Sequence, residues 1–280
     1  MEMNMTCEKI AVAGIQLSQV MGNRDANISE AIKAITKNPG HDIYVLPELS
    51  SSGYGIKVFQ ALEDLSEDVM GHSFKAFSDL AKRQKCFICY SFPKRVGNRK
   101  FTISTSVVDK NGSLVANYDK WHVCSTGVCC EKDYFSAGNK PLAAFDVNGI
   151  KVGLAICYDI RFPELARKLT MENHISLLLH PGGWPRDEGF HTWHTFIQVR
   201  AIENSIYIMS TNWAGPDNGC TAFCPPFIDG DKHKLKKLGN APGLLKGIVD
   251  IDFLKKVRRK CPYLADRNVD MYGNYGFKNL

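Results

Sequence analysis

Short apolar runs rich in β-branched residues alternate with amphipathic helical patterns along nearly the whole chain. Such alternation is typical of strand–helix–strand units, which fold into α/β layers. We expect strands at residues 9–17, 42–46, 86–92, 151–156, 175–179, 206–210 and 247–251, with helices at 24–36, 73–83, 163–171, 188–203 and 252–260. A hairpin is expected at 102–109 and 113–118, around Asn111-Gly112. The pattern fits either a doubly wound sheet or a sandwich of two sheets with helices outside.

The chain is expected to form one domain over residues 1–280, because no repeat, low-complexity tract or flexible linker divides it. Hydrophobic residues make up 44% and charged residues 23%, which excludes disorder and coiled coil. The longest apolar runs are far shorter than the roughly 20 residues that span a bilayer. We therefore expect no membrane partner.

Ten cysteines in 280 residues are too few for a disulfide scaffold, and neighbours such as Cys129 and Cys130 rarely pair with each other. The first seventeen residues lack both a basic region and a long apolar stretch, so no secretory signal is expected. Both observations predict a reducing, cytoplasmic location.

The net charge of +6 is concentrated in residues 229–260, which contain ten Lys and Arg residues and four Asp residues. Such a stretch could contact nucleic acid or an acidic surface. We favour two solvated faces, and therefore expect no nucleic-acid partner.

Polar residues at strand ends are the first candidates for chemistry, because ligands of α/β sheets bind beyond the carboxyl ends of strands. Three such residues are Glu48, Lys120 and Cys157. Pro163 suits the first turn of the next helix, whose dipole could lower the pKa of the Cys157 thiol. Each residue taken singly is more often structural than catalytic.

The surroundings of these three residues resemble the catalytic blocks of the nitrilase superfamily of carbon–nitrogen hydrolases. The resemblance extends from about Ile10 to Tyr272 and rests on order, spacing and flanking residues. The three blocks are Leu46-Pro-Glu48-Leu-Ser-Ser-Ser-Gly53-Tyr54, Tyr118-Asp-Lys120-Trp-His122 and Gly153-Leu-Ala-Ile-Cys157-Tyr-Asp-Ile-Arg161-Phe-Pro163-Glu164.

The resemblance implies a four-layer α-β-β-α sandwich and a Glu48, Lys120 and Cys157 triad. Cys157 would attack an amide carbonyl, Glu48 would act as the base, and ammonia would leave behind a thioester that water hydrolyses. Lys120 and the backbone N–H of Tyr158 would bind the oxyanion. Glu131 matches a second glutamate that orients the lysine and the substrate, and its alternative is an ordinary loop carboxylate.

The substrate is less determined. The usual His-Leu-Phe after the lysine is His122-Val-Cys124 here, and a late strand reads Gly219-Cys-Thr-Ala-Phe-Cys-Pro-Pro where Gly-x-Ser is frequent. Arg161 could bind a substrate carboxylate or pair with Asp159 or Glu164, while Tyr54 and Trp184 could line the pocket or pack in the core. The residues after Cys157 look most like amidases of small amides, including the ω-amidase type.

N-carbamoyl hydrolysis, or nitrile cleavage, is the alternative within the superfamily. A homodimer or higher homo-oligomer is expected from the resemblance. No metal or other cofactor is expected, because no complete ligand set is visible.

Three other classes compete with this interpretation. A zinc site could use Cys86 and Cys89, His191 and His194, or Cys220 and Cys224, but Cys86 and Cys89 would point to opposite faces of a strand. A Cys–His hydrolase could activate Cys157 through His122 or His180. A catalytically silent interaction module would be expected to lack one triad residue, yet all three are present.

Overall fold

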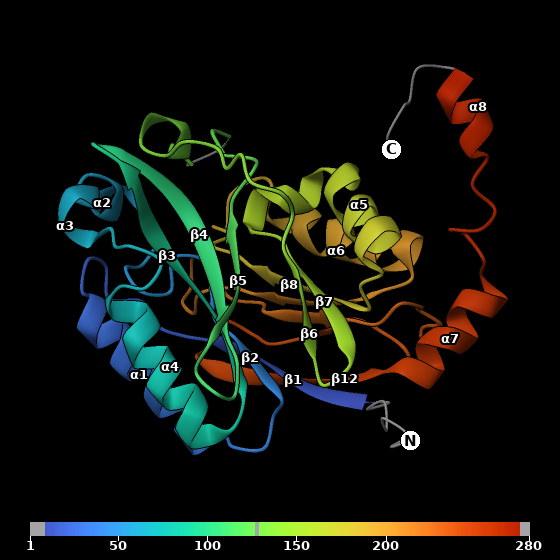
Figure 1. Ribbon diagram of the computed structural model, residues 1–280, viewed down its shortest axis with the longest axis horizontal. Helices are drawn as coiled ribbons and strands as arrows, with labels where there is room; N and C mark the ends of the chain where they lie inside the picture. Colours follow the sequence, from blue (N-terminus) through green and yellow to red (C-terminus); the bar gives the residue numbers. More distant parts are fainter. Residues whose placement is uncertain (1–8, 127–128, 275–280) are drawn as a thin grey trace.

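The structure, a computed structural model, describes residues 9–126 and 129–274. Residues 1–8, which belong to the segment considered above for a secretory signal, lie outside the described residues. The first sheet has six strands in the order β12-β1-β2-β3-β4-β5 (Figure 1). These strands are β1 (Lys9–Gln16), β2 (Ile43–Val45), β3 (Phe87–Gly97), β4 (Lys100–Val108), β5 (Leu114–Asp119) and β12 (Gly243–Asp250).

The second sheet also has six strands, in the order β11-β10-β9-β8-β7-β6. They are β6 (Ala144–Val147), β7 (Ile150–Leu154), β8 (Leu177–Pro181), β9 (Tyr207–Thr211), β10 (Ala222–Cys224) and β11 (Lys236–Lys237). In both sheets the central strands run parallel and the outer ones antiparallel.

The outer face of the first sheet is covered by α1 (Arg24–Lys37) and α4 (His72–Gln84). Asn23 caps α1 by accepting from the N–H of Ala26, and the helix turns Ile28, Ala31 and Ile35 inward. These side chains pack on those of alternate strand residues that face away from the second sheet. An amphipathic pattern in the sequence therefore becomes one outer layer.

The outer face of the second sheet is covered by α5 (Pro163–Asn173) and α6 (Phe190–Asn204) (Figure 1). Pro163 occupies the first turn of α5, as expected. Gly153 lets this layer approach closely, because a Cβ there would lie 3.1 Å from Leu169 Cδ1. The two sheets pack face to face, and their facing residues form the inner core. The expected four-layer α-β-β-α sandwich is confirmed.

The sequence predicted the long helices and most of the strands, and it missed several short elements. Not predicted were α2 (Ile56–Phe59), α3 (Leu62–Leu65), α8 (Val269–Asn274), β6, β11 and the 3-10 turns at Glu131–Asp133 and Cys157–Arg161. These elements are short and lack the apolar run or amphipathic period that marked the short central strands as well as the long helices.

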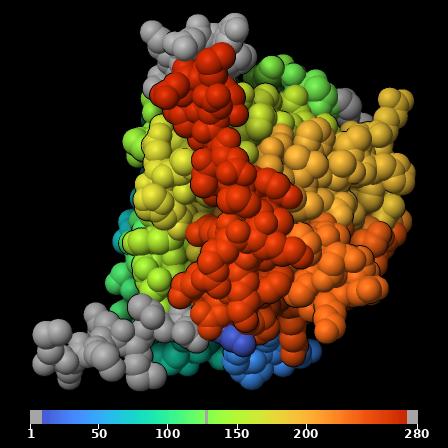
Figure 2. Space-filling model, turned by 90° about the vertical axis from the view of Figure 1, so that its right-hand side faces the viewer, coloured from blue at the N-terminus to red at the C-terminus, as the bar shows by residue number. Residues whose placement is uncertain are grey.

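The chain leaves the sandwich after α7 (Ile251–Lys260), and α8 stands apart from the layers in Figure 1. Figure 2 shows α7 and the segment after it lying along the outer surface. Among residues 9–126 and 129–274, none of the helices has both the length and the apolar character needed to span a bilayer.

Candidate active site

The ends of three strands bring the predicted triad together. Glu48 follows β2 and Lys120 follows β5 in the first sheet, while Cys157 follows β7 in the second. The Nζ atom of Lys120 lies 2.7 Å from Oε1 of Glu48 and 2.8 Å from both carboxylate oxygens of Glu131. Glu48 and Glu131 are 0% exposed, Lys120 is 1% exposed and Cys157 6%.

Glu48 is fixed from both sheets. Its backbone N–H donates to Gly182 O at 3.1 Å, and its carbonyl accepts from the indole Nε1–H of Trp213 at 2.9 Å. Lys120 binds Oε1, whereas Oε2 is buried without a hydrogen-bond partner in the described structure. Cys157 lies close enough to Glu48 to influence the pKa of its carboxyl group. Oε2 is therefore the oxygen left to receive a proton.

Glu131 is part of the buried cluster and not an ordinary loop carboxylate. Besides Lys120, it accepts from the hydroxyl of Tyr54 at 2.6 Å and from the backbone N–H of Cys124 at 2.8 Å. Donors therefore converge on both carboxylate oxygens of Glu131. Through these contacts Glu131 holds the lysine in place.

Burial has opposite effects on the acid and the lysine. It raises the pKa of Glu48 to about 7, with Lys120 opposing the rise and Glu131 adding to it. Burial alone would lower the pKa of Lys120, but Glu131 and Glu48 outweigh it and raise that pKa well above its ordinary value. The cluster therefore contains a fixed cation beside a carboxyl group that titrates near neutrality.

The expectation that a helix dipole lowers the pKa of Cys157 is wrong. Burial raises the pKa of this thiol well above its ordinary value, and Glu48 adds to the rise. In addition, a 3-10 turn over Cys157–Arg161 separates the cysteine from the first residue of α5. The thiol therefore needs a base at the moment of attack.

Cys157 has a left-handed backbone, with φ at +43°, which costs energy for a residue with a side chain. The buried Asp159 braces this turn by accepting from the N–H of Ile156 at 2.9 Å and from the hydroxyl of Tyr118 at 2.9 Å. It also bonds the backbone N–H and Nδ1 of His122, at 3.0 and 2.7 Å. Sequence reasoning missed this role of Asp159, because its partners Tyr118 and His122 lie about 40 residues away in the sequence.

The second histidine considered as a base, His180, has both of its ring nitrogens occupied by hydrogen bonds. His180 bonds the backbone carbonyl of Cys157 through Nε2, at 2.8 Å, and the hydroxyl of Ser210 through Nδ1, at 2.6 Å. His122 is oriented by Asp159, as above. The contacts of His180 therefore argue against it as the base, and Glu48 is the group whose carboxyl interacts with the Cys157 thiol.

Arg161 adopts neither of the expected carboxylate pairs. It makes no ion pair with Asp159 or Glu164, both of which the structure describes. Its guanidinium carbon lies 4.9 Å from the ring centre of Trp184, 5.1 Å from that of Phe196 and 5.7 Å from that of Tyr158. Its Nε atom is buried and unpartnered in the described structure.

Tyr54 and Trp184 both belong to the surroundings of the cluster. A Cβ on Gly183 would lie 2.9 Å from the Tyr54 ring and 3.2 Å from Glu48 Oε2, so the three groups adjoin. Trp184 is buried and stacks on Trp193, with ring centres 5.7 Å apart. Trp184 thus packs against Trp193 in the core and also contacts the Arg161 guanidinium.

The zinc alternative meets a geometric obstacle. Cys86 packs in the cluster under α1 and α4, whereas Cys89 packs between the sheets, so the predicted opposite faces are confirmed. His194 binds the carbonyl of Cys220 through Nε2 at 2.9 Å. In the described part of the chain, no three His, Cys, Asp or Glu side chains are grouped to hold a metal ion.

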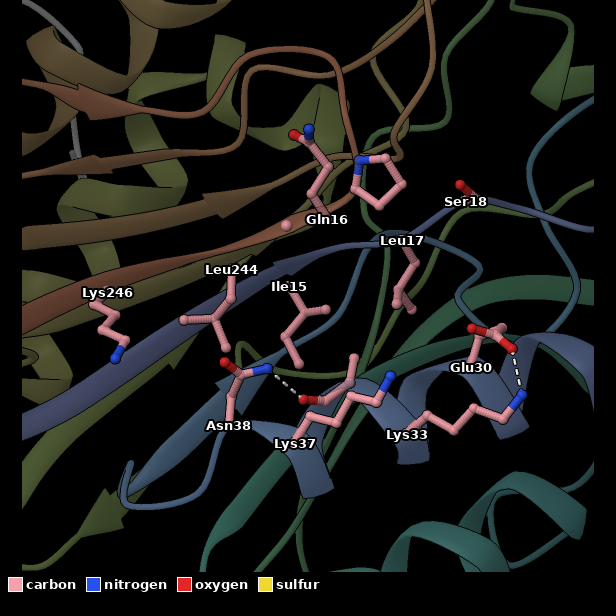
Figure 3. Close-up of a pocket in the computed structure, with 13 residues that line it drawn as sticks. Ile15, Gln16, Leu17, Ser18, Glu30, Lys33, Lys37, Asn38, Leu244 and Lys246 are labelled. Carbon is pink, nitrogen blue, oxygen red and sulfur yellow. Dashed lines mark hydrogen bonds and ion pairs between the residues drawn. The ribbon is translucent and has the colours of Figure 1, made fainter.

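A separate hollow of about 570 Å³ lies between α1 and the β1–β12 pair (Figure 3). Its floor includes Ile15 and Leu244, and Lys33 on its rim is paired with Glu30 at 2.7 Å. None of the triad residues lines it.

Comparison with known proteins agrees with this geometry. The family model "Carbon-nitrogen hydrolase" matches residues 11–239. The chain is 30% identical to 2-oxoglutaramate amidase of Bacillus subtilis over 268 residues, which cover 94% of this chain and all of that protein. It is 26% identical to mouse Omega-amidase NIT2 over 276 residues, covering 96% and 98% of the two chains.

A solved structure with the same architecture is the carbon–nitrogen hydrolase of Helicobacter pylori G27. It superposes with a TM-score of 0.81 at 23% sequence identity, covering 96% of this chain and 98% of that one. At that identity the likeness concerns the fold. Because the family model covers most of the sequence, the chain belongs to the carbon–nitrogen hydrolase family and is an enzyme of the nitrilase superfamily.

Proposed function

We propose that this enzyme is an amidase that hydrolyses small carboxamides through a thioester on Cys157. The observation that carries the proposal is a buried lysine held between two carboxylates, one of which keeps a free oxygen near a buried thiol. Burying three charges is costly, and a purely structural core would be more stable with apolar residues. The complete set of reacting groups argues against a silent interaction module.

The first half of the reaction forms the thioester. Glu48 Oε2 takes the proton of the Cys157 thiol as sulfur attacks the amide carbonyl, and the carbonyl oxygen becomes an oxyanion. The ammonium of Lys120 and the N–H of Tyr158 stabilise this charge. The carboxylic acid of Glu48 then gives its proton to the leaving nitrogen, the C–N bond breaks, and ammonia departs.

The second half restores the enzyme. Glu48, again a carboxylate, removes a proton from water as the water oxygen attacks the thioester. The second oxyanion collapses, the C–S bond breaks, and the sulfur regains a proton from Glu48. Throughout, Glu131 keeps Lys120 charged and in position, which leaves Glu48 free to exchange protons.

The activity is expected to depend on pH through Glu48. Because the carboxylate form is the base and its pKa is raised to about 7, kcat/KM should fall about tenfold for each pH unit below that value. Above it the rate should level off until other groups titrate. Initial rates of ammonia release between pH 5 and 9 measure this, and a flat profile from pH 5 to 8 would exclude Glu48 as the titrating base.

For the substrate, we propose an ω-amide that carries a distal carboxylate. Arg161 supports this choice because its guanidinium has no carboxylate partner among the described residues, lies over three aromatic rings and has an unpartnered Nε. A carboxylate binding there would form a charge-assisted pair in a poorly hydrated site. The printed names of the bacterial and mouse relatives, a 2-oxoglutaramate amidase and an ω-amidase, point to the same class of substrate.

Replacing Arg161 with methionine should lower kcat/KM for a dicarboxylic acid monoamide about ten- to hundredfold more than for an uncharged amide of equal length. The reason is that only the charged substrate loses an ionic partner. Arg161→Lys, which keeps the charge, should recover part of the difference. Equal losses on both amides would show that Arg161 has a structural role only.

The screen that tests the whole proposal measures ammonia release from short amides, ω-amides, N-carbamoyl compounds and nitriles. Fastest release from ω-amides supports the proposal. A preference for N-carbamoyl compounds or nitriles would move the enzyme to the alternative branch of its superfamily.

We propose a homodimer of single-domain subunits in a reducing, cytoplasmic location. The segment after α7 carries apolar side chains that this chain leaves exposed, at Tyr263, Val269, Met271 and Tyr272, and a second copy could cover them. The nine cysteines in the described part of the chain are all free, which fits a reducing compartment. The mass in solution, from light scattering, tests the dimer.

A further inference from the structure

The peptide that joins Cys157 to Tyr158 is anchored by a buried histidine. His180, on β8, is 0% exposed, and its Nε2 lies 2.8 Å from the carbonyl oxygen of Cys157. The mechanism above gives this ring no part in the proton transfers. His180 is therefore a buried polar group beside the nucleophile, and its role is still to be assigned.

The direction of the hydrogen bonds follows from chemistry. A carbonyl oxygen only accepts, so Nε2 of His180 carries the proton. Burial lowers the pKa of His180 to about 4, so the ring is neutral and Nδ1 accepts from the Ser210 hydroxyl at 2.6 Å. The Ser210 oxygen in turn lies 3.1 Å from the indole N–H of Trp193, which can only donate.

Donors therefore point one way along this chain, from Trp193 through Ser210 and His180 to the Cys157 carbonyl. That carbonyl shares a planar peptide with the N–H of Tyr158, so holding the oxygen fixes the direction of the hydrogen. Hydrogen bonding to the oxygen also polarises the peptide and makes its N–H a stronger donor. The strained φ of Cys157 gives this anchor a second task, because it supports the left-handed turn together with Asp159.

We propose that His180 is a positioning residue that orients and polarises the peptide whose Tyr158 N–H binds the oxyanion. The inference rests on the proposed function, because it assigns Tyr158 N–H to the oxyanion. His180 acts through the backbone and exchanges no proton with the substrate. Its loss should therefore weaken oxyanion binding while leaving the intrinsic reactivity of the thiol intact.

The experiment compares His180→Leu, which removes the donor, with His180→Gln, which keeps one, and with Ser210→Ala, which removes the partner of Nδ1. The matched control is His194→Leu, because His194 also bonds a backbone carbonyl through Nε2, at 2.9 Å, but that carbonyl belongs to Cys220. The control separates the loss of a hydrogen bond between a histidine and a backbone carbonyl from the loss of the bond to the Cys157 carbonyl.

Three quantities are measured for each variant. The first is kcat/KM for the best amide of the screen. The second is the inhibition constant of a short aldehyde, to whose carbonyl the Cys157 thiol adds, giving a hemithioacetal with its oxygen in the oxyanion site. The third is the rate at which methyl methanethiosulfonate modifies Cys157, followed on the Cys157 peptide by mass spectrometry. In this last reaction the thiolate displaces methanesulfinate to form a mixed disulfide, and no oxyanion arises.

His180→Leu should lower kcat/KM and weaken aldehyde inhibition by the same factor, about ten- to hundredfold. The expected loss is somewhat smaller than that caused by removing an oxyanion donor, because the Tyr158 N–H is still present. The rate of thiol modification should stay within about threefold of the wild type. His180→Gln should retain more activity than His180→Leu, Ser210→Ala should lose several-fold, and His194→Leu should match the wild type.

Parallel losses in amide turnover and in thiol modification would overturn the proposal, since His180 would then support the nucleophile or the fold. Unchanged aldehyde inhibition in His180→Leu would overturn it as well. If His180→Leu does not fold, Ser210→Ala decides by the same three measurements. If the wild type releases ammonia and His180→Leu and Ser210→Ala match it in all three measurements, only the role of His180 is refuted. If the wild type neither hydrolyses amides nor binds aldehydes, the proposed function itself is refuted.

Discussion

Replacing Cys157 with alanine should reduce ammonia release by roughly four orders of magnitude or more, as removal of a covalent nucleophile does in other hydrolases. The fold should survive, because the change removes one sulfur atom from a side chain that is 6% exposed. Cys157→Ser should be nearly as damaging, since a hydroxyl is a far weaker nucleophile beside a carboxylate of this pKa. Turnover and circular dichroism on the same preparation measure both effects.

Cys129→Ala is the matched control for this prediction. The Cys129 sulfur lies 3.4 Å from the hydroxyl of Tyr54, so it also adjoins the cluster, but no role in the reaction is assigned to it. This variant should keep most of the activity. Wild-type turnover by Cys157→Ala, or a dead Cys129→Ala beside an active Cys157→Ala, would contradict the assignment of the nucleophile.

Replacing Lys120 with methionine should abolish turnover to a similar degree and also destabilise the protein by about 3–5 kcal/mol, the usual cost of removing one partner from a buried ion pair. Glu48 and Glu131 would then face each other without a cation, so the pKa of at least one would rise. The loss of stability should therefore shrink as the pH falls and a carboxyl group becomes protonated. Urea denaturation at pH 5 and pH 8 measures the difference.

Lys94→Met provides the comparison. Lys94 is also buried and ion-paired, with Asp119, but it lies on the opposite face of the same sheet. The Lys94→Met substitution should lower the stability of the protein while leaving kcat largely unchanged.

His122→Ala should be milder than Lys120→Met. Combining Lys120→Ala with Cys157→Ala should be little worse than either substitution alone, because the two residues act as a unit. An active Lys120→Met beside a dead His122→Ala would support the Cys–His alternative.

Much of the architecture was predictable because it depends on local signals. The apolar runs that became β1 and β7 end abruptly in polar or small residues, and a long amphipathic period marks α1 and α4. The pattern alone left a doubly wound sheet and a two-sheet sandwich equally open. The distinction depends on how two groups of strands face each other, which is a tertiary contact that no local period encodes.

The site was predictable where a residue ends a strand and unpredictable where its role comes from distant contacts. Glu48, Lys120 and Cys157 were singled out by their positions at strand ends and assigned as a triad by the family resemblance, and the structure places them together. Asp159 and His180 gain their roles from partners on other elements, which sequence spacing does not reveal. The direction of the Cys157 pKa shift was wrong because the sequence shows the proline of α5 but not the turn before it or the depth of burial.

The pairing of β12 with β1 determines when this enzyme can become complete during synthesis. β1 occupies residues 9–16 and pairs with β2 on one side, but its other neighbour is made only from residues 243–250. A ribosome adding about 5–20 residues per second needs roughly ten seconds or more to reach that strand. During this time one edge of β1 has no partner, and such an edge can pair with other chains. The first sheet therefore closes late in synthesis. Until then β1, which supports the strand β2 that leads to Glu48, is paired on one side only.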